Sequence, residues 1–235
     1  IVAVVYPMLS KLSHDDNKEK FSEYIVKSSN SIILLVIPIS IGAIVLSKPI
    51  VKLLFERGAF DISATLMTAS ALSMYSIGLV AYGLRDIINK VFYSLQDTKT
   101  PMINGAIAMG LNIVLNIIFV KFMGHAGLAL ATSLSALICT FLLFYSLRKK
   151  IGNFGQEKIL TTAIKSLLSA ILMGVCVTFA HAFIINHTGT GFIGQVISIL
   201  VSVLAGVIVY GISVIILKIE EVSMIIDLLM KKIRR

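Results

Sequence analysis

The segment KSLLSAILMGVCVTFAHAFIINHTGTGFIGQVISILVSVLAGVIVYGISVIILK, from Lys165 to Lys218, decides the fold. The 52 residues between its two terminal lysines include no Asp, Glu, Lys or Arg, and the polar, glycine-bearing stretch Asn186–Gly191 interrupts them. An α-helix needs about 20 apolar residues to cross a hydrocarbon core about 30 Å thick. The segment therefore predicts two membrane-spanning helices joined by a short connection.

Four further uncharged windows extend this pattern towards the N-terminus. The windows Lys27–Lys48, Asp61–Arg85, Lys99–Lys121 and Lys121–Arg148 enclose 20, 23, 21 and 26 uncharged residues. A shorter apolar run, Ile1–Leu9, precedes them. We therefore predict an all-α integral membrane protein, a polytopic helix bundle of about seven transmembrane segments of which the first is truncated.

The composition excludes several other classes of protein. The 235 residues are 57% hydrophobic and 14% charged, whereas soluble domains are about 45–50% apolar and about 25% charged. Both values disfavour a soluble enzyme, a disordered chain and a disulfide-rich secreted protein. The chain begins with Ile1 inside an apolar run and shows no signal peptide, so we expect an N-terminal part to be missing.

The net charge of +9 follows the expected topology. Alternate connections between the predicted spans, together with the C-terminal tail, hold 17 Lys and Arg residues, and the connections on the other side hold 4. Cytoplasmic loops are enriched in Lys and Arg. This asymmetry predicts a cytoplasmic C-terminus and disfavours nucleic-acid binding. The basic, amphipathic tail is expected to lie on the cytoplasmic leaflet.

Residues inside the predicted spans indicate packing or a transport pathway instead of catalysis. The sequence contains no Walker loop, HExxH motif or CxxC pair, and its four histidines are scattered. Pro38 lies in the middle of a span, where it predicts a kink that either serves packing or acts as a hinge. Asn112 and Asn116 share one helix face, and Thr132 lies early in the next helix. We expect these polar groups to bond across the two helices.

Two motifs mark the connections. LFERGAFD at Leu54–Asp61 predicts a turn followed by a capped helix, and FYSLQDTKTP at Phe92–Pro101 ends one helix and starts another. With the Asn112 and Asn116 helix, GHAGLALATSLSA at Gly124–Ala136 and LRKKIG at Leu147–Gly152, these motifs resemble, in this order, the C-terminal half of the MurJ/MviN family. That family comprises the lipid II flippases of the multidrug/oligosaccharidyl-lipid/polysaccharide exporter superfamily.

The resemblance implies a 14-helix protein with two six-helix lobes and two additional helices. Residues 1–152 would supply the end of helix 8 and helices 9 to 12, which belong to the C-terminal lobe. Residues 153–217 would form the two additional helices, and residues 218–235 the basic cytoplasmic tail. The implied activity is movement of an undecaprenyl-pyrophosphate-linked peptidoglycan precursor to the outer leaflet of the bacterial cytoplasmic membrane by alternating access. The implied partners are this precursor, membrane lipids and the N-terminal lobe of the same protein.

The same resemblance assigns candidate site residues. The arginines expected to hold the pyrophosphate precede Ile1, which leaves Arg85, Asp86 and Lys27 as substrate or cavity candidates. Each is either snorkelled and paired at the interface or in contact with the headgroup. A cation constellation proposed for the family falls on Asn112, Asn116, the main chain of Leu128, and Thr132. Because Asn116 replaces a carboxylate, this set is either a sodium site or a neutral hydrogen-bonded bridge, and no other cofactor is implied.

Three alternatives to a flippase remain. The first is a sibling exporter of polysaccharide-lipid or drug cations. The second is a membrane glycosyl- or phosphotransferase, which would need acidic or His/Asp clusters that the isolated Asp86 and Asp97 do not supply. The third is a non-transporting scaffold. An arginine-rich first lobe preceding this sequence would favour the flippase.

Overall fold

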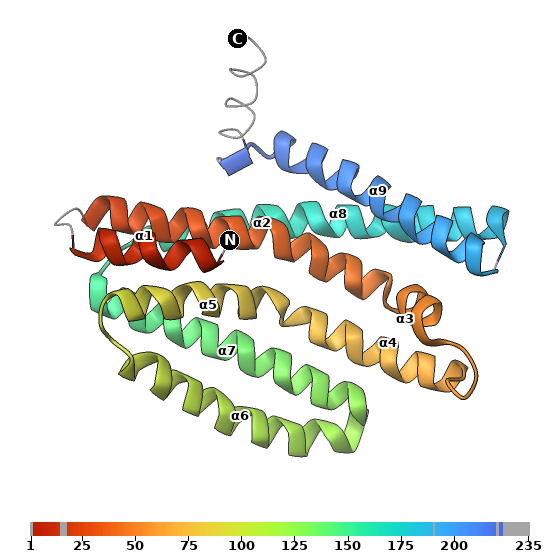
Figure 1. Ribbon diagram of the computed structural model, residues 1–235, viewed down its shortest axis with the longest axis horizontal. Coiled ribbons are helices and arrows are strands. Elements are labelled where there is room, and N and C mark those ends of the chain that lie inside the picture. The colour runs from red at the N-terminus through yellow and green to blue at the C-terminus, as the bar shows by residue number, and fades with distance from the viewer. Residues whose placement is uncertain (1, 15–17, 190, 220, 223–235) are drawn as a thin grey trace, which may run out of the picture.

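The computed structural model describes every residue except 1, 15–17, 190, 220 and 223–235, and the regular elements in this part of the chain are all α-helices (Figure 1). Their bounds are α1 Val2–His14, α2 Lys18–Val45, α3 Ser47–Phe55, α4 Ile62–Ile77, α5 Leu79–Ser94, α6 Lys99–Met123, α7 His125–Ile151, α8 Gln156–Thr188 and α9 Phe192–Ile216. Six segments are long and apolar enough to cross a membrane: α2, α4 with α5, α6, α7, α8 and α9. The prediction of a polytopic helical membrane protein with six complete spans is confirmed.

Two features of the helices differ from the expectation. The span that begins at Ile62 continues to Ser94, about nine residues beyond the uncharged window, and it is interrupted at Gly78. The short helix α3 was not expected, because its two lysines, Lys48 and Lys52, gave it the composition of a loop. Pro49 lies in the first turn of α3, where proline is tolerated because the N–H groups have no intrahelical acceptor.

The helices pack around α2 and α7. Helix α2 contacts α8, α5 and α4, α7 contacts α6, α4 and α5, and α9 lies mainly along α8. The largest hydrophobic cluster fills the space between α1, α2, α5 and α7, with fully buried residues including Leu9, Ile25, Ile87, Phe92 and Leu143. Since lipid is as apolar as these side chains, close van der Waals contact holds such helices together.

Glycine lets two of these helix pairs approach closely. A Cβ added at Gly78 would lie 2.8 Å from Cα of Ser133, and one added at Gly83 would lie 2.6 Å from a methyl group of Ile32. The first contact joins α4 and α5 to α7, and the second joins α5 to α2. These small residues therefore bring the helices together. Gly105 and Gly110 on α6 have no such neighbours among the residues that the structure describes.

Side-chain hydroxyl groups donate hydrogen bonds to backbone carbonyl groups that lack their usual helical donor. The break at Gly78 turns its N–H towards the carbonyl of Tyr75, and the hydroxyl of Ser133 on α7 donates to the carbonyl oxygen of Met74 at 2.6 Å. Pro38 has no N–H to offer the carbonyl of Leu34, and the hydroxyl of Tyr210 on α9 donates to that oxygen at 2.9 Å. Freed carbonyls inside a membrane span need such donors. Helix α2 consequently runs through Pro38 without ending.

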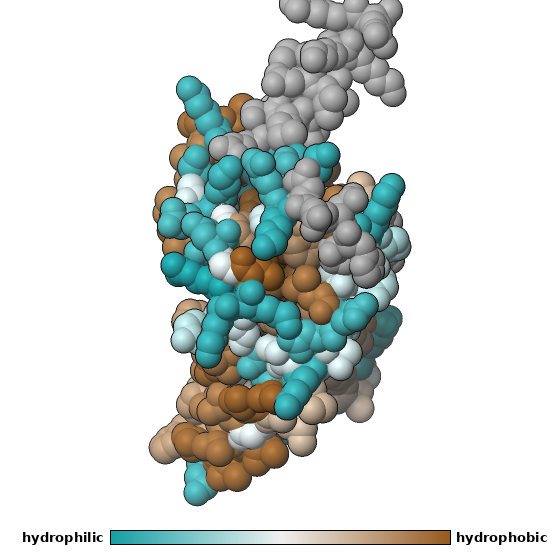
Figure 2. Space-filling model, turned by 90° about the vertical axis from the view of Figure 1, so that its left-hand side faces the viewer, coloured by the Kyte–Doolittle hydropathy of each residue, from teal (hydrophilic) through white to brown (hydrophobic). Residues whose placement is uncertain are grey.

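The connections alternate between two opposite ends of the bundle (Figure 1). The end of α1, the start of α2 and the α5–α6 and α7–α8 connections lie at the left-hand end of that view. Figure 2 shows this end face-on, with hydrophilic residues over much of its surface. The α3–α4, α6–α7 and α8–α9 connections lie at the other end. The connections that are rich in Lys and Arg therefore lie at the same end of the bundle. The predicted tail, residues 218–235, falls mostly outside the described residues.

Candidate functional site

The structure brings together all four members of the predicted polar cluster. Asn116 Nδ2 donates to Asn112 Oδ1 at 3.0 Å, and Asn112 Nδ2 lies 3.4 Å from Thr132 Oγ1 across the α6–α7 interface. The Thr132 hydroxyl in turn donates to the carbonyl oxygen of Leu128 at 2.8 Å. The cluster is a directed chain of hydrogen bonds from α6 to the backbone of α7.

This geometry fits a neutral bridge better than a cation site. The oxygens of Asn112 and Thr132 already accept hydrogen bonds from neighbouring donors. Among the side-chain oxygens of this cluster, only Asn116 Oδ1 is buried without a partner in the described part of the chain. A sodium ion prefers several free oxygen ligands, and a carboxylate strengthens such a set. No group of three or more His, Cys, Asp or Glu residues that could hold a metal ion lies in the described part of the chain. The role of the cluster stays a prediction.

Arg85 and Asp86 do not form the pair that one interpretation of the sequence expected. The Arg85 guanidinium lies 5.2 Å from the ring centroid of Tyr82, one turn earlier on α5. Asp86 is exposed and forms no ion pair with the residues that the structure describes. Adjacent residues of a helix point about 100° apart, which explains why the two side chains do not meet.

Lys27 is paired within its own helix. Its Nζ lies 2.6 Å from Glu23 Oε1, one turn earlier on α2, and both side chains are about half exposed. No contact joins Lys27 to Arg85 in the described part of the chain. The three candidates selected for headgroup contact thus lie on α5 and α2 without forming a single site.

The two sequence motifs prove to be capped connections. Asp61 accepts a hydrogen bond from the backbone N–H of Ala64 at the start of α4, and Gly58 adopts a positive φ of 59° in the preceding turn. Asp97 accepts from the N–H and hydroxyl of Thr100 at 2.9 and 2.8 Å and from Lys150 Nζ at 2.7 Å. The Lys150 ammonium and the Thr100 donors lower the pKa of Asp97 to about 2. Asp97 therefore ties the start of α6 to the end of α7.

One polar residue inside a span was not predicted from the sequence. Asn30 on α2 is 1% exposed, and its Nδ2 donates a hydrogen bond to Glu221, 191 residues later in the chain. Its position within an uncharged window was the available signal, because a buried amide needs partners. Its partner was not predictable, since no local spacing connects the two residues.

The fold and the motifs agree with the comparison to known proteins. The family model described as lipid II flippase MurJ matches residues 1–202. The chain belongs to the MurJ lipid II flippase family. It is 35% identical over 175 residues to the probable lipid II flippase MurJ of Vibrio cholerae, which covers 74% of this chain and 33% of that protein.

Two further MurJ relatives match over most of the chain. The probable lipid II flippase MurJ of Thermotoga maritima is 34% identical over 227 residues, 96% of this chain and 44% of the relative. The lipid II flippase MurJ of Thermosipho africanus is 31% identical over 209 residues, 89% of this chain and 40% of the relative. The chain spans about two fifths of the length of these MurJ proteins.

A solved MurJ structure shares the fold. The lipid II flippase MurJ in an inward closed conformation superposes with a TM-score of 0.71 and 29% identity, covering 92% of this chain and 43% of that chain. The resemblance stated from the motifs is therefore confirmed at the level of the family and of the helical architecture.

Proposed function

We propose that this chain is the C-terminal part of a lipid II flippase, which moves an undecaprenyl-pyrophosphate-linked peptidoglycan precursor from the cytoplasmic to the outer leaflet. The observation that carries the proposal is the match of residues 1–202 to the MurJ family model, supported by the shared fold of a solved MurJ structure. The proposal involves transport by alternating access and no covalent step.

A second lobe is part of the proposal. The matched relatives are more than twice as long as the aligned region, and alternating access moves one lobe against another around a central cavity. The six described spans correspond in this proposal to four helices of the C-terminal lobe and the two additional helices. We infer that the residues expected to hold the pyrophosphate lie in the N-terminal lobe and in the segment just before Ile1, so that this chain forms the distal wall of the cavity.

Complementation tests this function directly. In bacteria depleted of their own flippase, the intact protein containing this chain should restore growth and cell shape, and a form reduced to these 235 residues should not. Growth with the 235-residue form alone would contradict the two-lobed mechanism. Failure of the intact, membrane-inserted protein would contradict the flippase assignment itself.

The proposed orientation places the α1–α2, α5–α6 and α7–α8 connections in the cytoplasm. It rests on the 17-to-4 distribution of Lys and Arg and on the gathering of these connections at one end of the bundle. In a cysteine-free background, an impermeant thiol reagent added outside should label Arg57→Cys and spare Asn153→Cys. The opposite pattern of labelling would reverse the topology.

A further inference from the structure

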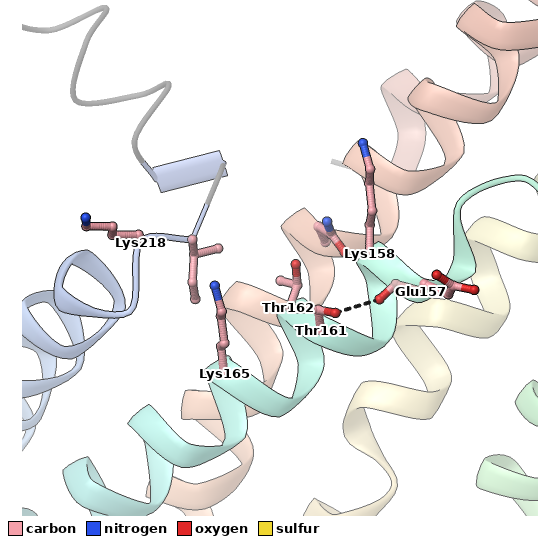
Figure 3. Close-up of a pocket in the computed structure, with 8 residues that line it drawn as sticks. Glu157, Lys158, Thr161, Thr162, Lys165 and Lys218 are labelled. Atoms are coloured by element: carbon pink, nitrogen blue, oxygen red, sulfur yellow. Dashed lines mark hydrogen bonds between the residues drawn. The ribbon is translucent and has the colours of Figure 1, made fainter.

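A cleft lies at the basic end of the bundle, between α2, α8 and the residues that follow α9 (Figure 3). Its volume is about 320 Å³, at the lower end of the ~300–1,000 Å³ typical of small-molecule sites. Its lining includes Lys158, Thr161 and Lys165 from α8, Asn30 from α2, and Lys218. None of these residues belongs to the polar cluster on α6 and α7.

Three lysines line the cleft. Lys158 and Lys165 are seven residues apart, so they project from the same face of α8. Lys218 follows the last turn of α9 on the opposite wall, and its side chain points away from α8 (Figure 3). None of the three forms an ion pair with a residue that the structure describes. The Glu157 side chain, which also lines the cleft, points away from Lys218 (Figure 3). The cleft is therefore suited to an anion.

Two buried oxygens add a second requirement. Asn30 is 1% exposed, and its Oδ1 accepts no hydrogen bond from the described residues. Beside the cleft, Glu221 accepts a hydrogen bond from Asn30 Nδ2. The other carboxylate oxygen of Glu221, Oε2, is also buried and accepts no hydrogen bond from the described residues. Buried acceptors are nearly always bonded, so these two oxygens are available to a ligand that brings hydrogen-bond donors. Phosphate alone, at neutral pH, is mainly an acceptor.

The helices that form the cleft continue into exposed apolar surface. Ile164 and Leu168 on α8 are 52% and 57% exposed, and Ile212 and Ile215 on α9 are 54% and 52% exposed. A polar cleft at the end of two membrane spans, above apolar helix faces, has the arrangement of a lipid headgroup with its acyl chains.

We propose that this cleft binds a glycerophospholipid whose headgroup carries both a phosphate and hydrogen-bond donors, such as phosphatidylglycerol. The lysine ammonium groups bind the phosphate, and the headgroup hydroxyls donate to Asn30 and Glu221. The lipid is a resident ligand at the α2–α8–α9 junction and is distinct from any transported substrate. The proposal stands whether or not the flippase assignment does.

Lipid retention by the intact protein tests the site. The purified protein is stripped of lipid, titrated with phosphatidylglycerol, and examined by native mass spectrometry. Changing Lys158, Lys165 and Lys218 together to Gln should weaken binding of the first lipid by at least about tenfold, because each basic group near a membrane contributes to anionic lipid binding. The matched control changes Lys11, Lys99 and Lys149 to Gln, which removes the same charge from exposed positions elsewhere at this end.

Two further measurements distinguish a lipid site from general charge attraction and from a site for a free anion. Asn30→Leu keeps all three lysines and should reduce the preference for phosphatidylglycerol over phosphatidylcholine, whose headgroup has a phosphate but no donor. Equal losses in the two triple variants would show a general effect of charge and overturn the proposal. Displacement of the lipid by millimolar inorganic phosphate would identify a site for a free anion and overturn the assignment to a lipid. A thermal melt of each variant confirms that it is folded.

Discussion

Helices α6 and α7 are neighbours of nearly equal apolarity, yet they occupy different environments. Half of the most apolar segment of α7 is buried within the bundle, compared with 6% of that of α6. Helix α7 contacts α4, α5 and α6, whereas α6 packs almost entirely on α7. Hydropathy therefore located both spans but did not distinguish the central helix from the peripheral one.

The difference lies in the residues that each helix presents. The buried face of α7 consists largely of small and hydroxyl-bearing residues, Gly127, Ala129, Ala131, Ser133, Ser135, Ala136, Cys139 and Thr140. Helix α6 exposes large side chains such as Met102, Met109 and Ile117. In lipid, small residues allow close helix contact and hydroxyls bond across helices, so residue size and polarity mark the buried span.

The largest expected effect contrasts two glycines. Gly78→Leu would press a side chain against the backbone of α7 at Ser133 and should lower the free energy of unfolding of the intact protein by about 2–3 kcal/mol. Gly110→Leu on α6 meets no described atom within 4 Å and should change it by less than about 0.5 kcal/mol. Unfolding titrations in mixed micelles measure both. Equal losses would show that α6 is as tightly packed as α7.

A smaller loss is expected when the hydroxyl at the α4–α5 break is removed. Ser133→Ala leaves the carbonyl of Met74 without its 2.6 Å donor and should cost about 1 kcal/mol, within the range of hydrogen bonds measured between membrane helices. Ser70→Ala is the matched control, because the Ser70 hydroxyl donates only to its own helix at Met67 and is exposed. A neutral result for Ser133→Ala, measured in the same titration, would show that α7 does not support the break.

The ion pair between Asp97, in the α5–α6 connection, and Lys150 on α7 gives a pH-dependent effect. Asp97→Asn should cost about 0.5–1 kcal/mol at neutral pH, an estimate reduced because Lys150 is partly exposed. The pKa of Asp97 is lowered from 3.8 to about 2, so the contribution is complete above about pH 5 and disappears as the pH falls towards 2. The difference between wild type and Asp97→Asn should shrink over that interval. A difference that grew on acidification would contradict the pairing.

The smallest effect is expected at Asn116. Asn116→Leu removes one neutral hydrogen bond of the polar cluster and should lower stability by about 0.6 kcal/mol, with lipid flipping by the intact protein insensitive to sodium at constant ionic strength. Asn116→Asp supplies a hard anionic ligand and should introduce sodium dependence. Strong sodium dependence in the wild type that Asn116→Leu abolished would assign a cation site to the cluster.

The sequence predicted what depends on local composition. The uncharged windows located all six spans, and the i, i+4 spacing of Asn112 and Asn116 with Thr132 in the next helix predicted their hydrogen-bonded cluster. The helix extensions beyond the windows were missed because charged residues end a window without ending a helix. The Asn30–Glu221 contact was missed because it joins residues 191 positions apart, which no periodicity encodes.

The Tyr210–Leu34 hydrogen bond has a consequence for the order of synthesis. A membrane protein is inserted from its N-terminus, so α2 enters the bilayer long before Tyr210, 176 residues downstream of Leu34, leaves the ribosome. Until then, the Leu34 carbonyl, to which Pro38 cannot donate a hydrogen bond, has no donor from α9. Water is scarce inside the membrane and does not replace that donor. Helix α2 thus acquires the donor for its Leu34 carbonyl only when α9 has been synthesised. In a chain that ends before Tyr210, the Leu34 carbonyl of α2 would permanently lack this hydrogen-bond donor.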